Sequence, residues 1–151
     1  MTTETADLLR QRSRAYSWGN TEQARHDPQL LAVVGSLSSA TFMVEAAVLA
    51  TADALGVAAD HVRDHGVVDE ELEFAARLAA SQVKVAVEEI SLRAAGEAFN
   101  AGGASWVRES VHLHRHWLNL RTLFSHNPTV YKARVVGDVL VNGAELPPTF
   151  F

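Results

Sequence analysis

The 151-residue sequence contains no cysteine, which excludes a disulfide scaffold, a thiolate metal site and a cysteine nucleophile. It has only nine glycines and four prolines, so its composition is not that of a disordered or fibrous chain. No apolar run precedes the arginines near the N-terminus, and no stretch approaches the roughly 18 apolar residues of a membrane span. We therefore expect one cytoplasmic domain with a hydrophobic core and without a signal peptide or membrane helix.

Charge is distributed unevenly along the chain. Residues 1–100 hold eight Lys and Arg against fifteen Asp and Glu, a net charge of −7, whereas residues 101–134 carry a net charge of +4. Four of the seven histidines also lie in this basic stretch. The pattern indicates a local anionic ligand, and it equally fits an ordinary solvated segment. A nucleic-acid binder would spread positive charge over a whole face, so we expect no nucleic-acid partner.

Apolar residues at helical spacing organise the first two thirds of the chain. Asp27 followed by Pro28 predicts a helix whose apolar stripe continues to about Leu55, where Gly56 offers a stop. Asp69 precedes a second helix that runs to about residue 99. This second helix is apolar on more than one side, so it must pack against other helices or a partner.

The last third predicts two more helices. After the break at residues 101–104, Ser105 can cap a helical stretch that runs to about Ser125, with a bend near Val111. Asn127 followed by Pro128 predicts the start of the last helix, which ends at Asn142-Gly143. No alternating strand pattern of useful length occurs. We predict an all-α, up-and-down four-helix bundle, with a lead-in segment at 1–26, the bundle domain at 27–143 and a tail at 144–151.

Residues 112–128, HLHRHWLNLRTLFSHNP, carry most of the polar chemistry. Arg115, Asn119 and Thr122 are spaced i, i+4 and i+7, so they share one face of a helix, and Arg121 lies off that face. The planar guanidinium groups of Arg115 and Arg121 suit a phosphate or a carboxylate. The segment therefore predicts an anion site.

The turn upstream adds to this inventory. The pair Gly102-Gly103 would let a ligand approach the backbone closely. Ser105 would begin a helix whose N-terminus can hold an anion. We therefore include Gly103 and Ser105 among the candidate cofactor-binding residues.

The histidines suggest different roles. His126 stands at a junction between helices, where an imidazole can donate to a developing oxyanion or act as a base, or can simply satisfy local backbone groups. His112 and His116 have the i, i+4 spacing of a helical metal site, but the nearby sequence offers Glu109 as the only acid. We expect no bound metal.

A longer pattern covers residues 102–143: a GGAS turn, then RHWxNxRT, then HNP, then YKxRxxGDxLxNG. This pattern resembles the C-terminal helical domain of acyl-CoA dehydrogenase-fold proteins. More narrowly, it resembles the flavin-dependent monooxygenase branch typified by dibenzothiophene monooxygenase. The upstream segments RQRSRAYSW and ARHDPQLLAVVGSLSSA are similar to those that open the domain, so the resemblance covers about residues 8–143.

The resemblance implies a flavoprotein of three domains: an N-terminal helical domain, a β-domain and this bundle. It implies dimers or tetramers, with reduced FMN supplied by a separate flavin reductase and oxidised by O₂. Arg12 or Arg14 would reach a flavin phosphate across a subunit interface, and His126 would handle the flavin–oxygen adduct. The flavin environment would also contain four residues of the predicted third helix: Arg115, Asn119, Arg121 and Thr122.

Two departures from the pattern leave alternatives open. Ser125-His126-Asn127-Pro128 stands where related dehydrogenases often carry a catalytic Glu, so an FAD-dependent acyl-CoA dehydrogenase is the second interpretation. Ala15-Tyr16 stands where the branch usually has Pro-Phe.

The N-terminal and β-domains are not in these 151 residues, so we expect no turnover unless they are supplied in cis or in trans. A third interpretation is a non-catalytic helical module that contributes only subunit contacts.

Overall fold

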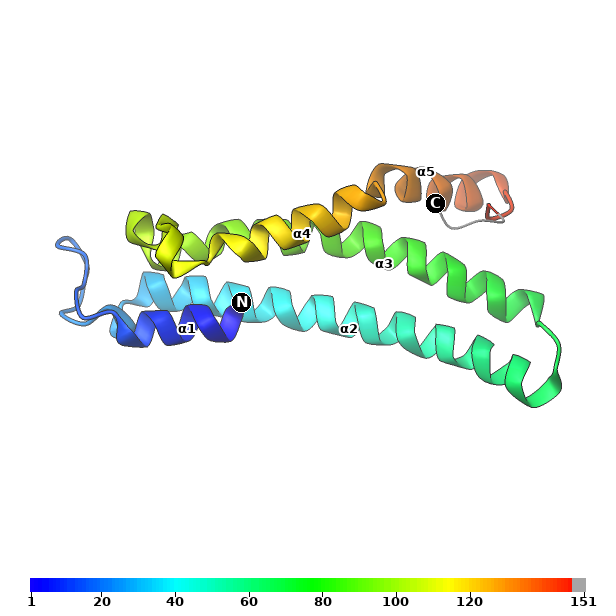
Figure 1. Ribbon diagram of the computed structural model, residues 1–151, viewed down its shortest axis with the longest axis horizontal. Helices are drawn as coiled ribbons and strands as arrows, with labels where there is room; N and C mark the ends of the chain where they lie inside the picture. Colours follow the sequence, from blue (N-terminus) through cyan, green and yellow to red (C-terminus); the bar gives the residue numbers. More distant parts are fainter. Residues whose placement is uncertain (148–151) are drawn as a thin grey trace. The chain divides into compact units, whose positions relative to one another are not determined.

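The computed structural model describes residues 1–147, and these residues form helices and turns without a strand (Figure 1). The all-α prediction is confirmed. The last four residues of the predicted tail, 148–151, lie outside the described part. Short 3-10 turns occur at 24–26, 98–101, 103–107 and 109–111. The α-helices are α1 (Thr2–Gln11), α2 (Pro28–His65), α3 (Glu70–Glu97), α4 (His114–His126) and α5 (Thr129–Asn142).

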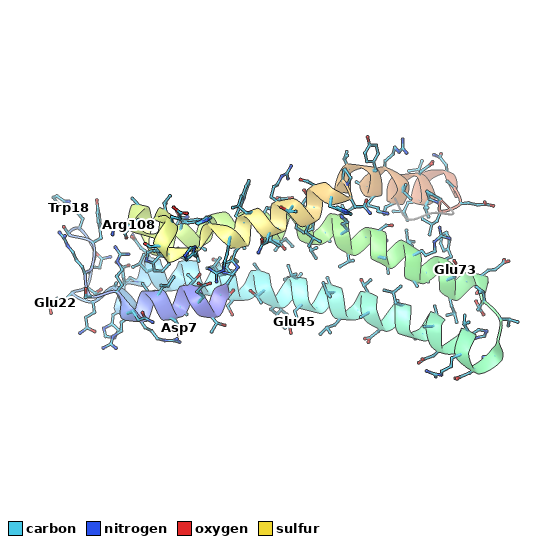
Figure 2. The ribbon with its side chains drawn as sticks, viewed as in Figure 1. Asp7, Trp18, Glu22, Glu45, Glu73 and Arg108 are labelled. Carbon is cyan, nitrogen blue, oxygen red and sulfur yellow. The ribbon has the colours of Figure 1, made fainter. Side chains whose placement is uncertain are left out.

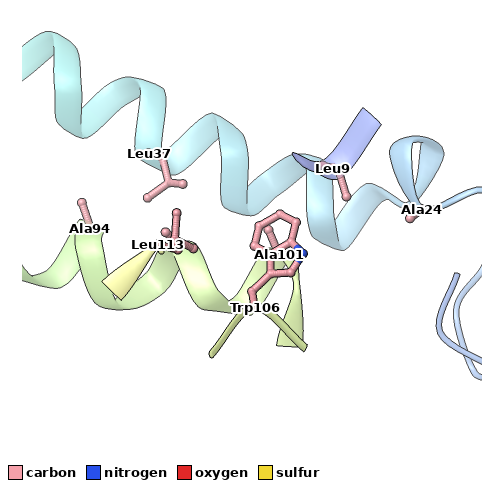
Figure 3. Close-up of a cluster of buried hydrophobic side chains, with 8 residues drawn as sticks. Leu9, Ala24, Leu37, Ala94, Ala101, Trp106 and Leu113 are labelled. Carbon is pink, nitrogen blue, oxygen red and sulfur yellow. The ribbon is translucent and has the colours of Figure 1, made fainter. Parts of the chain in front are cut away.

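The chain divides into two compact units, and the first comprises residues 1–43 and 90–122. Its core contains Leu37 and Leu113, which are almost completely buried, together with Leu9 of α1 and Trp106 (Figure 3). Alanines complete the cluster, and their small side chains allow the backbones to approach closely. Helix α1, which lies in the predicted lead-in segment, therefore contributes directly to this core.

The second unit comprises residues 44–89 and 123–151. Its buried residues include Ala76 and Ser81 on α3 and Phe124 on α4. The Arg77 guanidinium donates a hydrogen bond to the carbonyl of Pro147, which ties the segment after α5 to α3. Lys84 Nζ donates to the carbonyl of Leu123 at 3.4 Å.

Helix α2 is longer than predicted because it does not stop at Gly56. It continues to His65 and ends where Gly66 adopts a left-handed φ of 73°. A glycine within a helix lowers helix stability by about 1 kcal/mol relative to alanine but leaves the backbone hydrogen bonds intact. No proline follows Gly56 within α2 to end the helix. The exposed ion pair from Arg63 to Asp60 also supports the last turns.

Local caps account for two of the predicted helix starts. The carboxylate of Asp69 accepts hydrogen bonds from the backbone of Glu71 and Leu72, both at 3.0 Å, and Asp27 accepts one from the backbone of Gln29 at 2.9 Å. The predicted start of the last helix differs, since Asn127 does not cap α5 and its Oδ1 is buried without a hydrogen-bond partner. The predicted end of α5 is confirmed by Gly143, which has φ 63°.

The helical stretch predicted for 105–125 is only partly correct. Residues 103–111 form 3-10 turns, and the α-helix begins at His114. His112 interrupts the chain with a left-handed φ of 55°, which a continuous α-helix cannot contain. Ser105 therefore lies inside a five-residue 3-10 turn and does not cap an α-helix.

Helix α2 also corrects the expectation that no stretch is long and apolar enough to cross a membrane. One stretch of α2 meets that criterion by length and composition, and none of the residues of this stretch is buried. A single helix of this kind is weak evidence for a membrane protein, because helices of soluble proteins meet the same test. The finding does establish that α2 presents a large apolar surface.

Candidate cofactor site

A pocket of about 530 Å³ forms where the chain leaves α1. It is lined by the segment Gln11–Ser17 and, from the turn before α4, by Ser105. The lining contains two arginines, three serines and one tyrosine and no acidic side chain. Guanidinium and hydroxyl groups without a competing carboxylate are suited to an oxyanion such as a phosphate.

The two arginines of this pocket have different surroundings. Arg12 is half-buried, and its guanidinium donates to the carbonyl of Ala101 at 2.9 Å and to that of Arg14 at 3.0 Å. Arg14 is exposed, and its own guanidinium has no hydrogen-bond or ion-pair partner within residues 1–147. Arg12 therefore shapes the pocket wall, and Arg14 offers a free planar fork to a ligand.

The glycine pair upstream of α4 has two separate functions. A Cβ on Gly102 would lie 1.7 Å from an indole carbon of Trp106, so the space beside this glycine is filled by the buried tryptophan and not by a ligand. Gly103 has a left-handed φ of 61° with open space around it, so its role is conformational. The Ser105 hydroxyl donates to the Gly102 carbonyl at 2.9 Å, which closes the turn.

The sequence predicts that Arg115 binds an anionic ligand. In the structure its guanidinium binds a carboxylate side chain of the same unit. Its Nη2 donates to both carboxylate oxygens of Glu4, at 2.9 and 2.8 Å, and its Nη1 donates to the His112 carbonyl at 2.7 Å. His116 donates from Nε2 to the same carboxylate at 2.6 Å. The hydrogen bond from His116 and those from Arg115 lower the pKa of Glu4 although its burial acts in the opposite direction.

The remaining candidates of α4 are exposed. Asn119, Arg121 and Thr122 lie on the helix as predicted, and the Thr122 hydroxyl donates to the Leu118 carbonyl at 2.9 Å. None of them, and not Arg115, lines the pocket beside Arg14. The structure thus brings together Arg12, Arg14 and Ser105 but does not bring the α4 residues into that pocket.

His126 is the last residue of α4 and belongs to the second unit. Its side chain is exposed, and two residues separate it from α5. The imidazole is therefore accessible to solvent at the end of a helix. Within residues 1–147 no three or more His, Asp or Glu side chains gather in a group that could hold a metal ion.

Sequence reasoning missed Glu4 and the polar wall of the pocket. Glu4 lies 111 residues from Arg115, and no spacing rule connects positions so far apart. Ser13, Tyr16 and Ser17 line the pocket together with the arginines. The cluster of hydroxyl and guanidinium side chains in RQRSRAYS was the available signal for this wall.

Known proteins resemble this chain over part of their length. The probable FMNH2-dependent monooxygenase SfnC of Pseudomonas putida is 32% identical over 74 residues, which are 49% of this chain and 19% of that protein. The methanesulfinate monooxygenase MsuC of Pseudomonas fluorescens superimposes with a TM-score of 0.87 and 28% identity, over 99% of this chain and 38% of its own. The FMN-bound TdsC of Paenibacillus sp. A11-2 shares the fold, with a TM-score of 0.84, 23% identity, and coverage of 99% of this chain and 36% of its own.

The chain therefore spans between about a fifth and two fifths of the length of these relatives. A family model described as acyl-CoA dehydrogenase, C-terminal domain, matches residues 1–130. The match includes α1, the pocket segment, all of α2–α4 and the start of α5. The chain belongs to the acyl-CoA dehydrogenase C-terminal domain family.

Proposed function

We propose that this chain is the C-terminal domain of a two-component FMN-dependent monooxygenase, in which it binds the flavin phosphate and supplies one catalytic residue. The observation that carries the proposal is the pocket of Arg12, Arg14 and Ser105, whose lining has hydroxyl and guanidinium donors and no acid. The similarity to SfnC and MsuC supports a monooxygenase, and the FMN in TdsC supports that cofactor.

The residues of the pocket have distinct roles in this proposal. Arg14 donates to the phosphate because its guanidinium is exposed and has no partner in the described residues. Arg12 fixes the chain around the phosphate through the carbonyls of Ala101 and Arg14. Ser105 holds the Gly102–Ser105 turn at the edge of the pocket. Bound FMN, reduced by a separate reductase, supplies the redox chemistry.

His126 is the proposed catalytic residue. Its exposed imidazole can hold a proton or donate one to an oxygen atom that develops negative charge. The N-terminal and β-domains of the larger relatives would complete the site and exclude water from it. Self-association into dimers or tetramers would place the arginines of one copy beside the flavin of another.

A hybrid enzyme tests this proposal. The chain replaces the matching C-terminal segment of MsuC, and oxygenation and FMNH2 affinity are measured for the hybrid and its variants. We expect Arg14→Ala to weaken FMNH2 binding by about tenfold or more, since a hydrogen bond to a charged group contributes about 1.5–3 kcal/mol. Arg108→Ala, which removes an exposed arginine outside the pocket, is the matched control and should leave binding unchanged.

The same hybrid tests His126. We expect His126→Ala to abolish product formation while the affinity for FMNH2 changes by less than about tenfold, which corresponds to 1.4 kcal/mol. Unchanged oxygenation in this variant would exclude the catalytic role. Anaerobic bleaching of bound flavin by an acyl-CoA would instead assign the domain to a dehydrogenase.

A further inference from the structure

Glu4 connects two helices that are far apart in sequence. Its carboxylate, in the first turn of α1, accepts hydrogen bonds from Arg115 at 2.8 and 2.9 Å and from His116 at 2.6 Å, both in the first turn of α4. All three residues belong to the first compact unit. The Arg115 guanidinium is also held by the carbonyl of His112, so it cannot rotate away without losing a second contact.

This cluster is partly shielded from water. The side chains of Glu4 and His116 are 31% and 22% exposed, so solvent screens their attraction less than that of a fully exposed ion pair. The neighbouring pair on α1 provides a contrast, since Asp7 and Arg10 pair with each other within the helix and are 50% and 66% exposed. Glu4 is thus the acidic residue of α1 that links this helix to another element.

The opposite end of α1 leads into the phosphate pocket. The helix ends at Gln11, and Arg12 follows directly with its hydrogen bond to the Ala101 carbonyl. Leu9 is buried in the core one turn earlier. A helix of ten residues is about 15 Å long and stiff over that distance. Fixing its first turn therefore restricts where its last turn can place Arg12 and the segment to Ser17.

We propose that Glu4 is a positioning residue for the pocket: by binding Arg115 and His116 it fixes α1, and α1 holds the Arg12–Ser17 segment in the geometry that receives a phosphate. In this arrangement Arg115 acts through Glu4 and does not bind the anion. The binding part of the inference rests on the proposed function, whereas the fixing of the segment does not.

Hydrogen exchange of the full chain tests the fixing directly. Glu4→Gln removes the charge and weakens the contacts to α4, so we expect the Arg12 amide, which donates to the Leu9 carbonyl at 3.2 Å, to exchange faster by about two- to fivefold. Asp7→Asn makes the same change of charge on the same helix without a link to α4, and it should leave the exchange of this amide unchanged (Figure 2). Equal exchange of the Arg12 amide in the two variants would overturn the proposal.

Titration with inorganic phosphate tests the consequence for binding. We expect Glu4→Gln to weaken phosphate binding by about two- to fivefold, with Arg14→Ala marking the pocket as the site. Tighter binding in Glu4→Gln would overturn the proposal, because it would mean that Glu4 competes with the anion for Arg115. We also combine Glu4→Gln with Arg115→Gln. We expect this double variant to lose no more phosphate affinity than the weaker-binding single variant, and additive losses of affinity would contradict a shared role of the two residues.

Hydrogen exchange and phosphate titration distinguish a failure of the positioning role of Glu4 from a failure of the proposed function. If the unmodified chain and its Arg14→Ala variant bind phosphate equally, the phosphate pocket of the proposed function fails. The exchange rate of the Arg12 amide then decides the positioning role of Glu4 alone.

Discussion

At the scale of single residues, Glu4 makes the stability of the fold depend on pH. Its pKa is lowered from the ordinary value of 4.5 by the hydrogen bonds of His116 and Arg115. A carboxyl group with a lowered pKa in the folded state stabilises the fold above its unfolded pKa, and this contribution is lost as the pH falls through the folded value. We expect the free energy of unfolding of the unmodified chain to exceed that of Glu4→Gln by at most about 1 kcal/mol at pH 6.

The difference between these two proteins should shrink as the pH falls below 4.5 and through the lowered pKa of Glu4 in the folded state, because the carboxyl group is then protonated first in the unfolded and then in the folded state. Urea denaturation at each pH, monitored by circular dichroism, measures this difference in the free energy of unfolding. Asp7→Asn provides the background for removing one carboxylate from α1. A difference that is constant with pH would show that the charge of Glu4 does not stabilise the fold.

Gly102 gives a second prediction, which depends on space alone. Its φ of −113° is accessible to any residue, but a Cβ there would lie 1.7 Å from Trp106. We expect Gly102→Ala to lower the free energy of unfolding by about 1–3 kcal/mol, as overpacking of a core does, measured by urea denaturation. Gly96→Ala on α3, where nothing lies within 4 Å of the added Cβ, is the control and should not destabilise the chain.

Single residues also show where sequence reasoning ends. The residue type of Arg115 predicted a group that suits an anion, but side-chain type does not reveal which partner a guanidinium meets. Arg115 meets Glu4, and this depends on the packing of α1 in the first unit. The approach of Ser105 to the arginines likewise depends on tertiary packing and not on local spacing.

At the scale of helices, sequence rules succeeded where the cause was local. Asp27 and Asp69 predicted helix starts because each carboxylate bonds to backbone groups two or three residues ahead. Asn127-Pro128 correctly predicted a helix start, since α5 begins at Thr129, but Asn127 makes no cap hydrogen bond and its Oδ1 is buried without a partner. Gly56 failed as a stop because glycine ends a helix only where the chain must adopt a left-handed conformation, and that occurs at Gly66.

The continuity of α2 through Gly56 provides a prediction for this helix. A Cβ at Gly56 would meet nothing within 4 Å, so Gly56→Ala gains helix propensity without a clash. We expect it to raise the free energy of unfolding by about 0.5–1 kcal/mol in urea denaturation. Gly66→Ala makes the same chemical change at φ 73° and should lower it by about 1 kcal/mol. Destabilisation by Gly56→Ala would contradict a continuous helix at this position.

At the scale of the whole molecule, α2 exposes a large apolar surface, which is unfavourable in water unless another surface covers it. Phe42, Met43 and Leu49 are 70%, 56% and 57% exposed. Because Phe42 and Leu49 are seven residues apart, two turns of helix place them on one face. Large exposed apolar patches mark interaction surfaces, and the chain spans 38% of the MsuC chain that it resembles. We infer that a second copy of this chain covers this face.

Self-association of the isolated chain tests that inference. We expect the average mass in sedimentation experiments to rise with concentration, and Phe42→Lys combined with Leu49→Lys to return the chain to a monomer. Since both side chains are exposed, the unfolding free energy of the monomer should change by less than about 0.5 kcal/mol. Phe42→Leu with Leu49→Met keeps the face apolar and should keep the association. A monomer at every concentration that binds phospholipid vesicles through α2 would instead assign this face to a membrane.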